Sequence, residues 1–460
     1  DVYKRQLYEE INKSLGAGFM EEHPFEDFEP NNFSDENYSK IDLHKNIVDK
    51  IILVSKSGKK MFREADLIDV WFDSGSMPYA QWHYPFENKE FIDKKSFYPA
   101  DFIAEGVDQT RGWFYTLHAI STLVFDSISY KNVVSNGLVL DKNGQKMSKR
   151  LGNAIDPFKT LSDFGPDATR WYMISNSNPW DNLKFDLGGV DEVKRKFFGT
   201  LYNTYSFFAL YANIDKFIYD EKEIEFNERP ELDRWILSEL NSLINNVDEF
   251  YNDYEPTKAA RAINNFVIDN LSNWYVRLSR RRFWKGEYEK DKISAFQTLY
   301  KVLIDVSKLS APISPFFMDR LYIDLTKNIG KNYSESIHLE DFPVADNSKI
   351  DLRLQQKINY AQTISSLTLS LRAKEKIKVR QPLSKILIPV NNIEQKNIIK
   401  SISEEIKREV NVKSIEFLEG ESDLLVKSIK PNFKKLGPTY GKYMKEISAH
   451  VNSFDNHSII

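Results

Sequence analysis

The pattern that most limits how this chain can fold is a run of apolar residues at helical spacing in its second half. Eight apolar positions recur every three or four residues between residues 232 and 254, over more than five turns. That period is typical of an amphipathic α-helix with one buried face. The eight positions are Leu232, Trp235, Ile236, Leu240, Leu243, Val247, Phe250 and Tyr254.

The same kind of pattern continues beyond this segment. Pro256 stands where a helix favours proline, at its first position, and the apolar positions that follow are Ala260, Ile263, Val267, Leu271, Trp274 and Leu278. Residues 299–306 and 316–325 add two more helical patterns. The sequence therefore predicts an all-α helical bundle in this part of the chain.

Strands and helices alternate on both sides of the predicted bundle. Residues 51–63 predict a hairpin that turns at Ser57-Gly58, and residues 69–140 predict the second half of a doubly wound, Rossmann-like sheet. Within it, Trp113, Leu117, Ile120 and Val124 give one helix a buried face. After residue 346, a helix at 352–371, a strand at 386–390, a charged helix to 410 and a strand at 415–417 predict a small α/β domain. The fold class is therefore α/β plus all-α.

A basic segment, Lys146-Met147-Ser148-Lys149-Arg150, follows a predicted strand and turn. Two ammonium groups on one mobile loop can close over a polyphosphate leaving group, and lysine suits this as a compact charge on a flexible stem. The alternative is a solvated basic turn, which is what most short charge runs are. The sequence segments around residues 146–150 are needed to choose between these two interpretations.

A second polar block, residues 105–109, lies where a predicted strand ends and a helix begins. In an open α/β sheet, ligands bind beyond the carboxyl ends of the strands. Carboxylates at that edge can bind an α-ammonium group and ribose hydroxyls. Glu105 and Asp108 could instead serve only as helix caps, and Trp113 could be an ordinary core aromatic.

Together these blocks resemble the class I aminoacyl-tRNA synthetases. Residues 146–150 resemble their KMSKS loop, and the spans 66–78, 105–114 and 146–157 together resemble the isoleucyl enzymes of the larger, eukaryote-like type. The resemblance implies that the chain activates isoleucine with ATP and transfers it to tRNA(Ile). The chain departs from the usual signature at Arg150, where the family usually has serine. An arginine at this position also occurs in the family.

The resemblance also assigns individual residues. It implies that Lys146 and Lys149 are catalytic, and that the ATP-binding residues are Lys146, Met147, Ser148 and Lys149. The residues implied to contact isoleucine or its adenylate are Glu105, Gly106, Asp108, Gln109 and Trp113. Trp113 would then form a wall of the pocket for the apolar side chain.

The family's other ATP-binding signature, His-x-Gly-His, is absent, since none of the seven histidines forms such a pair. We therefore expect an internal or C-terminal portion of a longer synthetase, without the editing domain and inactive by itself. The expected parts are a connection from the editing insertion (1–68), half of the catalytic domain (69–190), an anticodon-binding bundle (191–345) and a C-terminal α/β domain (346–460).

Composition narrows the cofactors and partners. The chain has no cysteine, so the zinc that family members often bind has no thiolate ligands, and we expect no metal site beyond Mg²⁺ carried by ATP. No apolar run approaches the ~20 residues that span a bilayer. We expect a cytoplasmic protein that binds tRNA(Ile), isoleucine and ATP, does not bind membranes, and is a monomer at full length.

The net charge of −4 does not by itself suggest a nucleic-acid partner. One local cluster does: residues 277–285 hold five cations with interleaved aromatics, which suits phosphate contact and base stacking. The candidate tRNA-binding residues are Arg277, Arg280, Arg281, Arg282 and Lys285. The alternative is a solvated helix face neutralised by Glu287 and Glu289.

Two classes of function remain open on the sequence alone. The first is part of an isoleucine–tRNA ligase, with a valine, leucine or methionine enzyme as the alternative substrate assignment. The second is a tRNA-binding module without catalysis.

Overall fold

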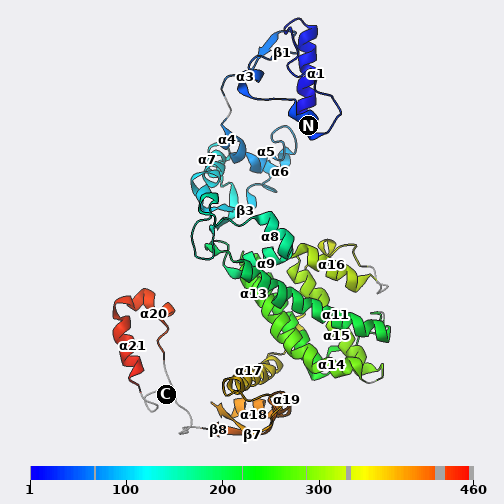
Figure 1. Cartoon of the computed structure of the whole chain (residues 1–460), viewed down its shortest axis with the longest axis vertical. Helices are drawn as coiled ribbons and strands as arrows, with labels where there is room; N and C mark the ends of the chain where they lie inside the picture. The colour runs from blue at the N-terminus through cyan, green and yellow to red at the C-terminus, as the bar shows by residue number, and fades with distance from the viewer. Residues whose placement is uncertain are drawn as a thin grey trace. The chain divides into compact units, whose positions relative to one another are not determined.

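The computed structural model describes residues 2–66, 69–219, 221–285, 287–327, 333–419 and 430–454. The chain forms two compact units, Asp1–Ser135 and Asn136–Ile460 (Figure 1). The predicted class, α/β followed by all-α, is confirmed, although the sheets of the described residues are small and two-stranded. Within the described residues, none of the helices combines the length and apolar character that a membrane crossing requires.

The first unit begins with a helix packed on a hairpin. Helix α1 (Val2–Gly16) contacts β1 (Ile52–Val54), which pairs in antiparallel fashion with β2 (Lys60–Phe62). Gly58 turns the hairpin at a φ of +77°, a conformation that favours glycine. The predicted hairpin is therefore confirmed. Short helices α2 (Asp35–Ser39) and α3 (Lys45–Val48) complete the segment, and its buried core is Ile11, Phe25, Phe28, Ile41 and Ile51.

The rest of the first unit contains strand β3 (Ala100–Gly106), helix α7 (Trp113–Phe125) and strand β4 (Tyr130–Asn136), with β3 beside β4. Three short helices precede them: α4 (Val70–Gly75), α5 (Met77–Ala80) and α6 (Lys89–Asp93). Leu117 of α7 is fully buried, as predicted. The prediction was wrong at Val124, which is 58% exposed. The small cluster of Ile103, Phe114 and Leu117 does not extend to the last turn of the helix.

The second unit opens with a short parallel pair, β5 (Val139–Leu140) and β6 (Leu183–Lys184). Helices α8 (Pro157–Phe164) and α9 (Pro166–Asn176) lie between them in sequence, and each begins with proline. The Asp156 carboxylate accepts hydrogen bonds from the amides of Phe158 and Lys159 and so caps α8. Helix α10 (Leu187–Val193) continues through a π-helical turn into α11 (Gly199–Asp215).

The predicted bundle is confirmed. Its helices are α11, α12 (Glu231–Asn252), α13 (Pro256–Asn265), α14 (Arg277–Trp284), α15 (Lys290–Ser310) and α16 (Pro315–Thr326). A π-helical segment, η5 (Phe266–Val276), joins α13 to α14 without a break. Trp235, Ile236 and Val247 are fully buried, as their spacing predicted. Leu278 is 39% exposed, contrary to the prediction.

The helices and strands that were predicted after residue 346 are also present, within the second unit. Helix α17 (Leu352–Lys374) packs on α12 and α19 (Ser403–Val410), and α18 (Ile393–Ser401) precedes α19. Strands β7 (Leu383–Val390) and β8 (Val412–Glu419) run parallel, with Leu383 opposite Val412. Two further helices, α20 (Phe433–Tyr440) and α21 (Met444–Asn452), follow.

Candidate functional site

The turn after β3 gathers the residues that were expected to contact an amino acid. Strand β3 ends at Gly106, residues Val107–Arg111 form one 3-10 turn, and α7 begins at Trp113. Glu105 and Asp108 are both exposed, and neither caps the helix. Gln109 does so instead, because its Oε1 accepts a hydrogen bond from the Trp113 amide at 2.9 Å. The Gln109 Nε2 also donates to Asp108 Oδ2 at 3.3 Å.

Trp113 is fixed by the helix that precedes it in sequence. Its indole Nε1 donates to the carbonyl oxygen of Ser74 at 2.9 Å, and its half-buried ring packs against the cluster around Leu117. Gly75 lets α4 approach α7, because a Cβ there would lie 2.6 Å from Ile120 Cδ1. A Cβ on Gly112 would lie 2.7 Å from Gln109 Oε1. The hydrogen bonds of Gln109 and Trp113 hold the turn in place.

The basic loop is anchored by two side chains that flank it. The Asp141 carboxylate accepts hydrogen bonds from the amides of Asn143 and Gln145, at 2.9 and 2.8 Å. Asn153 Nδ2 donates to the same carboxylate at 2.9 Å, and Asn153 Oδ1 accepts from the Ser148 amide at 2.9 Å. The Gln145 amide and the Asn153 side chain are the main reasons that the pKa of Asp141 lies below its usual value. The loop backbone is thus fixed at both ends.

The loop presents its first lysine to solvent. Lys146 and Arg150 are exposed, whereas Met147 is half-buried and packs against the main core. The backbone of Lys149 begins a short 3-10 turn, and its side chain lies outside the described part of the structure. An exposed ammonium group on an anchored backbone can approach an anionic ligand with little rearrangement of the chain. The loop belongs to the second compact unit, whereas the turn after β3 belongs to the first.

The cationic segment of α14 divides into an outward and an inward side. Arg277, Arg280, Arg281 and Trp284 recur at helical spacing, and all four are exposed. Lys285 follows directly and is also exposed. Among the described residues, no acidic partner pairs with Arg280, Arg281 or Lys285, whereas Arg277 pairs with Glu409 of α19. We call Arg277, Arg280, Arg281 and Trp284 the α14 stripe.

Arg282 points the other way, into the bundle. Its guanidinium donates to both carboxylate oxygens of the fully buried Asp233, at 2.5 and 2.8 Å. It also donates to Asp291 Oδ2 through Nε, at 3.1 Å. Burial disfavours the charge on Arg282, but the hydrogen bond and charge of Asp233 outweigh that effect and raise the pKa of the guanidinium. Arg282 is engaged inside the protein, so the outward cations are Arg277, Arg280, Arg281 and Lys285.

The sequence did not predict the residues that hold the turn and the loop in place. The sequence predicts Gln109 as a ligand contact and not as a helix cap, and it predicts no role for Asp141 or Asn153. An Asp-x-Asn-Gly turn before the loop was the one available signal for Asp141. Among the described residues, no group of three or more histidine, cysteine, aspartate or glutamate side chains is placed to hold a metal ion.

Two protein families match separate parts of the chain. Residues 18–186 match the family described as tRNA synthetases class I (I, L, M and V). Residues 233–387 match the anticodon-binding domain of tRNA ligase. The first span contains both the turn after β3 and the basic loop, and the second contains the α14 stripe.

Several curated relatives are similar over nearly the whole chain. An isoleucine–tRNA ligase of Bacteroides fragilis is 61% identical over 99% of this chain, and one of Porphyromonas gingivalis is 60% identical over 99%. One of Clostridium tetani is 47% identical over 90%. The chain spans about 40% of the length of these relatives. A solved LeuRS of Agrobacterium radiobacter K84, in a ternary complex with tRNA and LeuAMS, aligns with 81% of this chain and 44% of its own, at 16% identity and a TM-score of 0.49.

Proposed function

Because the chain belongs to the isoleucine–tRNA ligases among the class I tRNA synthetases, we propose that its residues take part in joining isoleucine to tRNA(Ile) with ATP. The observation that carries this proposal is the anchored basic loop. Asp141 and Asn153 fix its backbone while Lys146 stays exposed. Because its backbone is anchored and its ammonium group is exposed, such a loop can bind a polyphosphate with little rearrangement of the chain.

The proposed chemistry has two steps. The carboxylate of isoleucine attacks the α-phosphorus of ATP, isoleucyl-adenylate forms and pyrophosphate leaves. The acyl group then passes to the terminal ribose of tRNA(Ile), and AMP leaves. Neither step needs a covalent bond to the protein, so positioning and charge stabilisation supply the catalysis.

Each residue has a proposed role in the first step. Lys146 and Lys149 stabilise the negative charge that develops on pyrophosphate, and the backbone of Met147 and Ser148 carries them. In the other compact unit, Glu105, Gly106 and Asp108 bind the ammonium group and ribose, with Gln109 and Trp113 beside them. The exposure of both carboxylates and the Gln109 cap support these roles, because the carboxylates are not used to hold the helix.

The cofactor proposals follow from the donor groups in this chain. We expect Mg²⁺ to come bound to the phosphates of ATP, where it would neutralise their charge. A cysteine-ligated zinc site has no ligands in this sequence. We further propose that the protein works in the cytoplasm, and as a monomer at the length of its relatives.

The proposed domain roles use the boundaries inferred from the sequence. Residues 1–68 connect to an editing insertion, 69–190 belong to the catalytic domain, 191–345 bind the anticodon arm, and 346–460 form a C-terminal appendage. The match of residues 233–387 to an anticodon-binding domain supports the third assignment.

The α14 stripe is the proposed tRNA contact. Two of its arginines, Arg280 and Arg281, are exposed and unpaired within the described residues. Phosphate contacts release counterions, so binding should weaken steeply with salt. We propose that Arg277, at one end of the stripe, and Lys285, directly after its other end, complete this contact.

The tRNA contact can be tested on the 460-residue chain by fluorescence anisotropy with labelled tRNA(Ile). The double variant Arg280→Ala/Arg281→Ala should weaken binding and lower the slope of log affinity against log salt by about 1–2. The matched control is Arg320→Ala on α16, an exposed arginine that pairs with Asp324 at 3.0 Å. Equal affinities and slopes for the double variant and the control would reject the α14 stripe as the contact.

The catalytic proposal is tested by amino-acid-dependent exchange of pyrophosphate into ATP. The assay uses an enzyme of the relatives' full length that carries this sequence. Isoleucine should support exchange at far lower concentrations than valine, leucine or methionine. Exchange that prefers one of the other three amino acids would overturn the substrate assignment, and no exchange with any of them would leave tRNA binding as the function.

A further inference from the structure

Helix α13 carries an arginine that holds the last turn of its neighbour, helix α9 (Figure 1). Arg261 Nε donates to the carbonyl oxygen of Ser175, and one of its terminal nitrogens donates to that of Asn176, each at 2.8 Å. The last carbonyls of a helix have no amide partners within the helix, and a cation there also meets the negative end of the helix dipole. Arg261 therefore supplies both hydrogen bonds and charge to this helix end.

A threonine one turn earlier on α13 holds the same end of α9. The Thr257 hydroxyl is fully buried and lies 2.7 Å from the carbonyl oxygen of Ile174 and 3.0 Å from that of Ser177. The two carbonyls share its single proton. Side chains of α13 thus bind four consecutive carbonyls, those of residues 174–177. We call Thr257 and Arg261 the α13 clamp.

Hydrogen bonds connect the clamped end of α9 to the base of the basic loop. The Tyr172 hydroxyl of α9 donates to the carbonyl oxygen of Lys184 in β6, at 3.0 Å. Strand β6 pairs with β5, and the Phe185 amide donates to the carbonyl oxygen of Leu140, the last residue of β5, at 2.9 Å. Asp141, which anchors the basic loop, comes next in the chain. The end of α9 and the loop therefore share one strand pair as their support.

The segment between α9 and β6 also fits closely against the chain that leads into β5. The Gly137 amide donates to the carbonyl oxygen of Pro179 at 2.9 Å, and the Leu138 amide donates to Asn182 Oδ1 at 2.8 Å. A Cβ on Gly137 would clash with the carbonyl oxygen of Asp181, so the two backbones can approach only because this residue is glycine. A displacement of the end of α9 would therefore move this segment and the base of the loop together.

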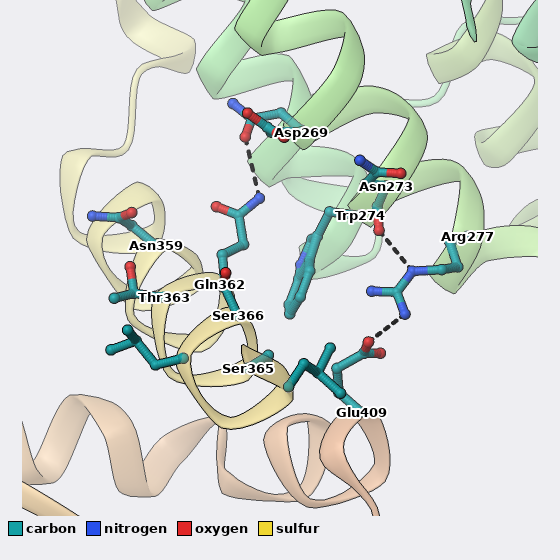
Figure 2. Close-up of a pocket in the computed structure, with 13 residues that line it drawn as sticks. Asp269, Asn273, Trp274, Arg277, Asn359, Gln362, Thr363, Ser365, Ser366 and Glu409 are labelled. Carbon is teal, nitrogen blue, oxygen red and sulfur yellow. Dashed lines mark hydrogen bonds and ion pairs between the residues drawn. The ribbon is translucent and has the colours of Figure 1, made fainter. Parts of the chain in front are cut away.

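The helix that carries the α13 clamp is itself fixed in the second unit. Ile263 of α13 is fully buried, and α13 runs without a break into η5. Along η5, a cavity of about 840 Å³ separates this helix from α17 and α19 (Figure 2). Gln362 of α17 donates to Asn270 across it at 3.1 Å, and Figure 2 shows Arg277 paired with Glu409 of α19. A contact that positions another group has to come from such a rigid element.

Therefore we propose that Thr257 and Arg261 are positioning residues for the basic loop. They act through the end of α9 and the β5–β6 pair, which set where Asp141 places the loop. This inference rests on the proposed function, because it requires the loop to act on pyrophosphate. The lysines of the loop stabilise the leaving group only at the correct distance, and a displacement of about 1 Å from a remote change can slow a reaction about 10²-fold.

The kinetic test uses an enzyme of the relatives' full length that carries this sequence. Arg261→Met removes the donors to α9 and keeps an apolar stem. In isoleucine-dependent pyrophosphate exchange it should lower kcat about 10- to 100-fold. The KM for isoleucine should stay unchanged, because the proposed isoleucine contacts lie in the other compact unit. Arg261→Lys keeps the charge and a donor, so it should recover part of the lost rate.

The matched control is Lys258→Met, which removes another exposed cation from the same helix. Lys258 pairs with Glu255 at 2.9 Å, within one turn of α13. Its replacement should change neither kcat nor the KM for isoleucine. Urea unfolding of each variant checks that it folds, and the exposure of Arg261 means that its removal leaves no cavity in the core.

Amide hydrogen exchange on the 460-residue chain tests the position of the loop without catalysis. The amides of Gln145 and Ser148 donate to Asp141 and Asn153, so their exchange is slow only while the loop is anchored. Arg261→Met should speed the exchange of these two amides and leave the amides of α15 unchanged. Lys258→Met should affect neither set.

The outcomes separate this inference from the proposed function. If kcat of Arg261→Met stays within about threefold of Lys258→Met, or if the loop amides exchange at the same rate in both, the positioning role is overturned. If the loop amides and those of α15 speed up together, Arg261 only stabilises the fold and the role is again overturned. If the unsubstituted enzyme shows no exchange of pyrophosphate, the proposed function fails, and the loop amides alone decide whether the α13 clamp positions the loop.

Discussion

Replacing Arg282 should destabilise the bundle far more than it weakens RNA binding, and the opposite should hold for its neighbour Arg281. Arg282 donates two hydrogen bonds to Asp233, whose side chain is fully buried. The other donors to that carboxylate are neutral: the Tyr275 hydroxyl at 2.9 Å and the Ser294 hydroxyl at 2.6 Å. Without Arg282, a buried negative charge would keep only these two bonds.

The size of the loss can be worked from these contacts. A hydrogen bond to a charged group contributes about 1.5–3 kcal/mol, so loss of the two bonds to Asp233 in Arg282→Met costs about 3–6 kcal/mol. The two bonds to Asp291 are also lost but lie on the exposed side of the guanidinium and add little. Measured losses for one partner of a buried ion pair are about 3–5 kcal/mol. The two ranges overlap at about 3–5 kcal/mol, which is the expected fall in the free energy of unfolding. Arg281→Met removes an exposed side chain and should change it by less than about 0.5 kcal/mol.

The assay is urea unfolding followed by tryptophan fluorescence, because Trp235 and Trp274 lie in the bundle core. Adding Asp233→Asn to Arg282→Met should recover at least about 1 kcal/mol, since it removes the buried charge and keeps an acceptor for Tyr275. Anisotropy with tRNA(Ile) below the unfolding transition completes the comparison. If Arg282→Met and Arg281→Met were equally stable, or if Arg282→Met alone lost RNA affinity, the inward role of Arg282 would be wrong.

Three further predictions concern the proposed site and the bundle. Lys149→Ala, in an enzyme of the relatives' length, should slow isoleucine-dependent pyrophosphate exchange by about 10²- to 10³-fold, because a charge that stabilises the leaving group is lost; a rate within about threefold of the unsubstituted enzyme would reject that role. Glu105→Gln and Asp108→Asn should raise the half-saturating isoleucine concentration in the same assay, and unchanged kinetics for isoleucine and ATP would remove both from the site. The hydrogen bond from Lys308, with help from other donors, lowers the pKa of Glu340 to about 2, so its stabilisation is complete above pH 4.5 and is lost as the pH falls toward 2. Glu340→Gln should therefore cost about 1–2 kcal/mol at pH 7 once solvent screening is allowed for, and a difference from the unsubstituted chain that stayed constant in urea unfolding between pH 7 and pH 2.5 would refute this.

The sequence by itself determined the features that depend on neighbouring residues. The helical period from Leu232 to Val247 placed one buried face, because residues three and four apart lie on the same side of a helix whatever surrounds it. Gly58 fixed the hairpin turn in the same local way. The turn after β3 and the basic loop are each an unbroken stretch of sequence. Their motifs, and the order of the two motifs along the chain, therefore carried the family assignment.

Local patterns failed where contacts between distant residues decide. The sequence grouped Arg282 with the other cations of residues 277–285, but its partner Asp233 lies 49 residues away, and only the packed bundle turns that arginine inward. Val124 has the right spacing for burial and is exposed, because the rings of Tyr79 and Tyr98 that cover the last turn of α7 pack on its neighbour Phe125.

The cavity beside η5 is the clearest case of what tertiary structure adds. Gln362 donates to Asn270 at 3.1 Å across 92 residues of chain, and Glu409 closes the same cavity from α19. No period or motif links these three polar residues, since each is ordinary in its own helix. Packing of α17 and α19 against the bundle brings their side chains to one place, so the cavity exists only in the folded second unit.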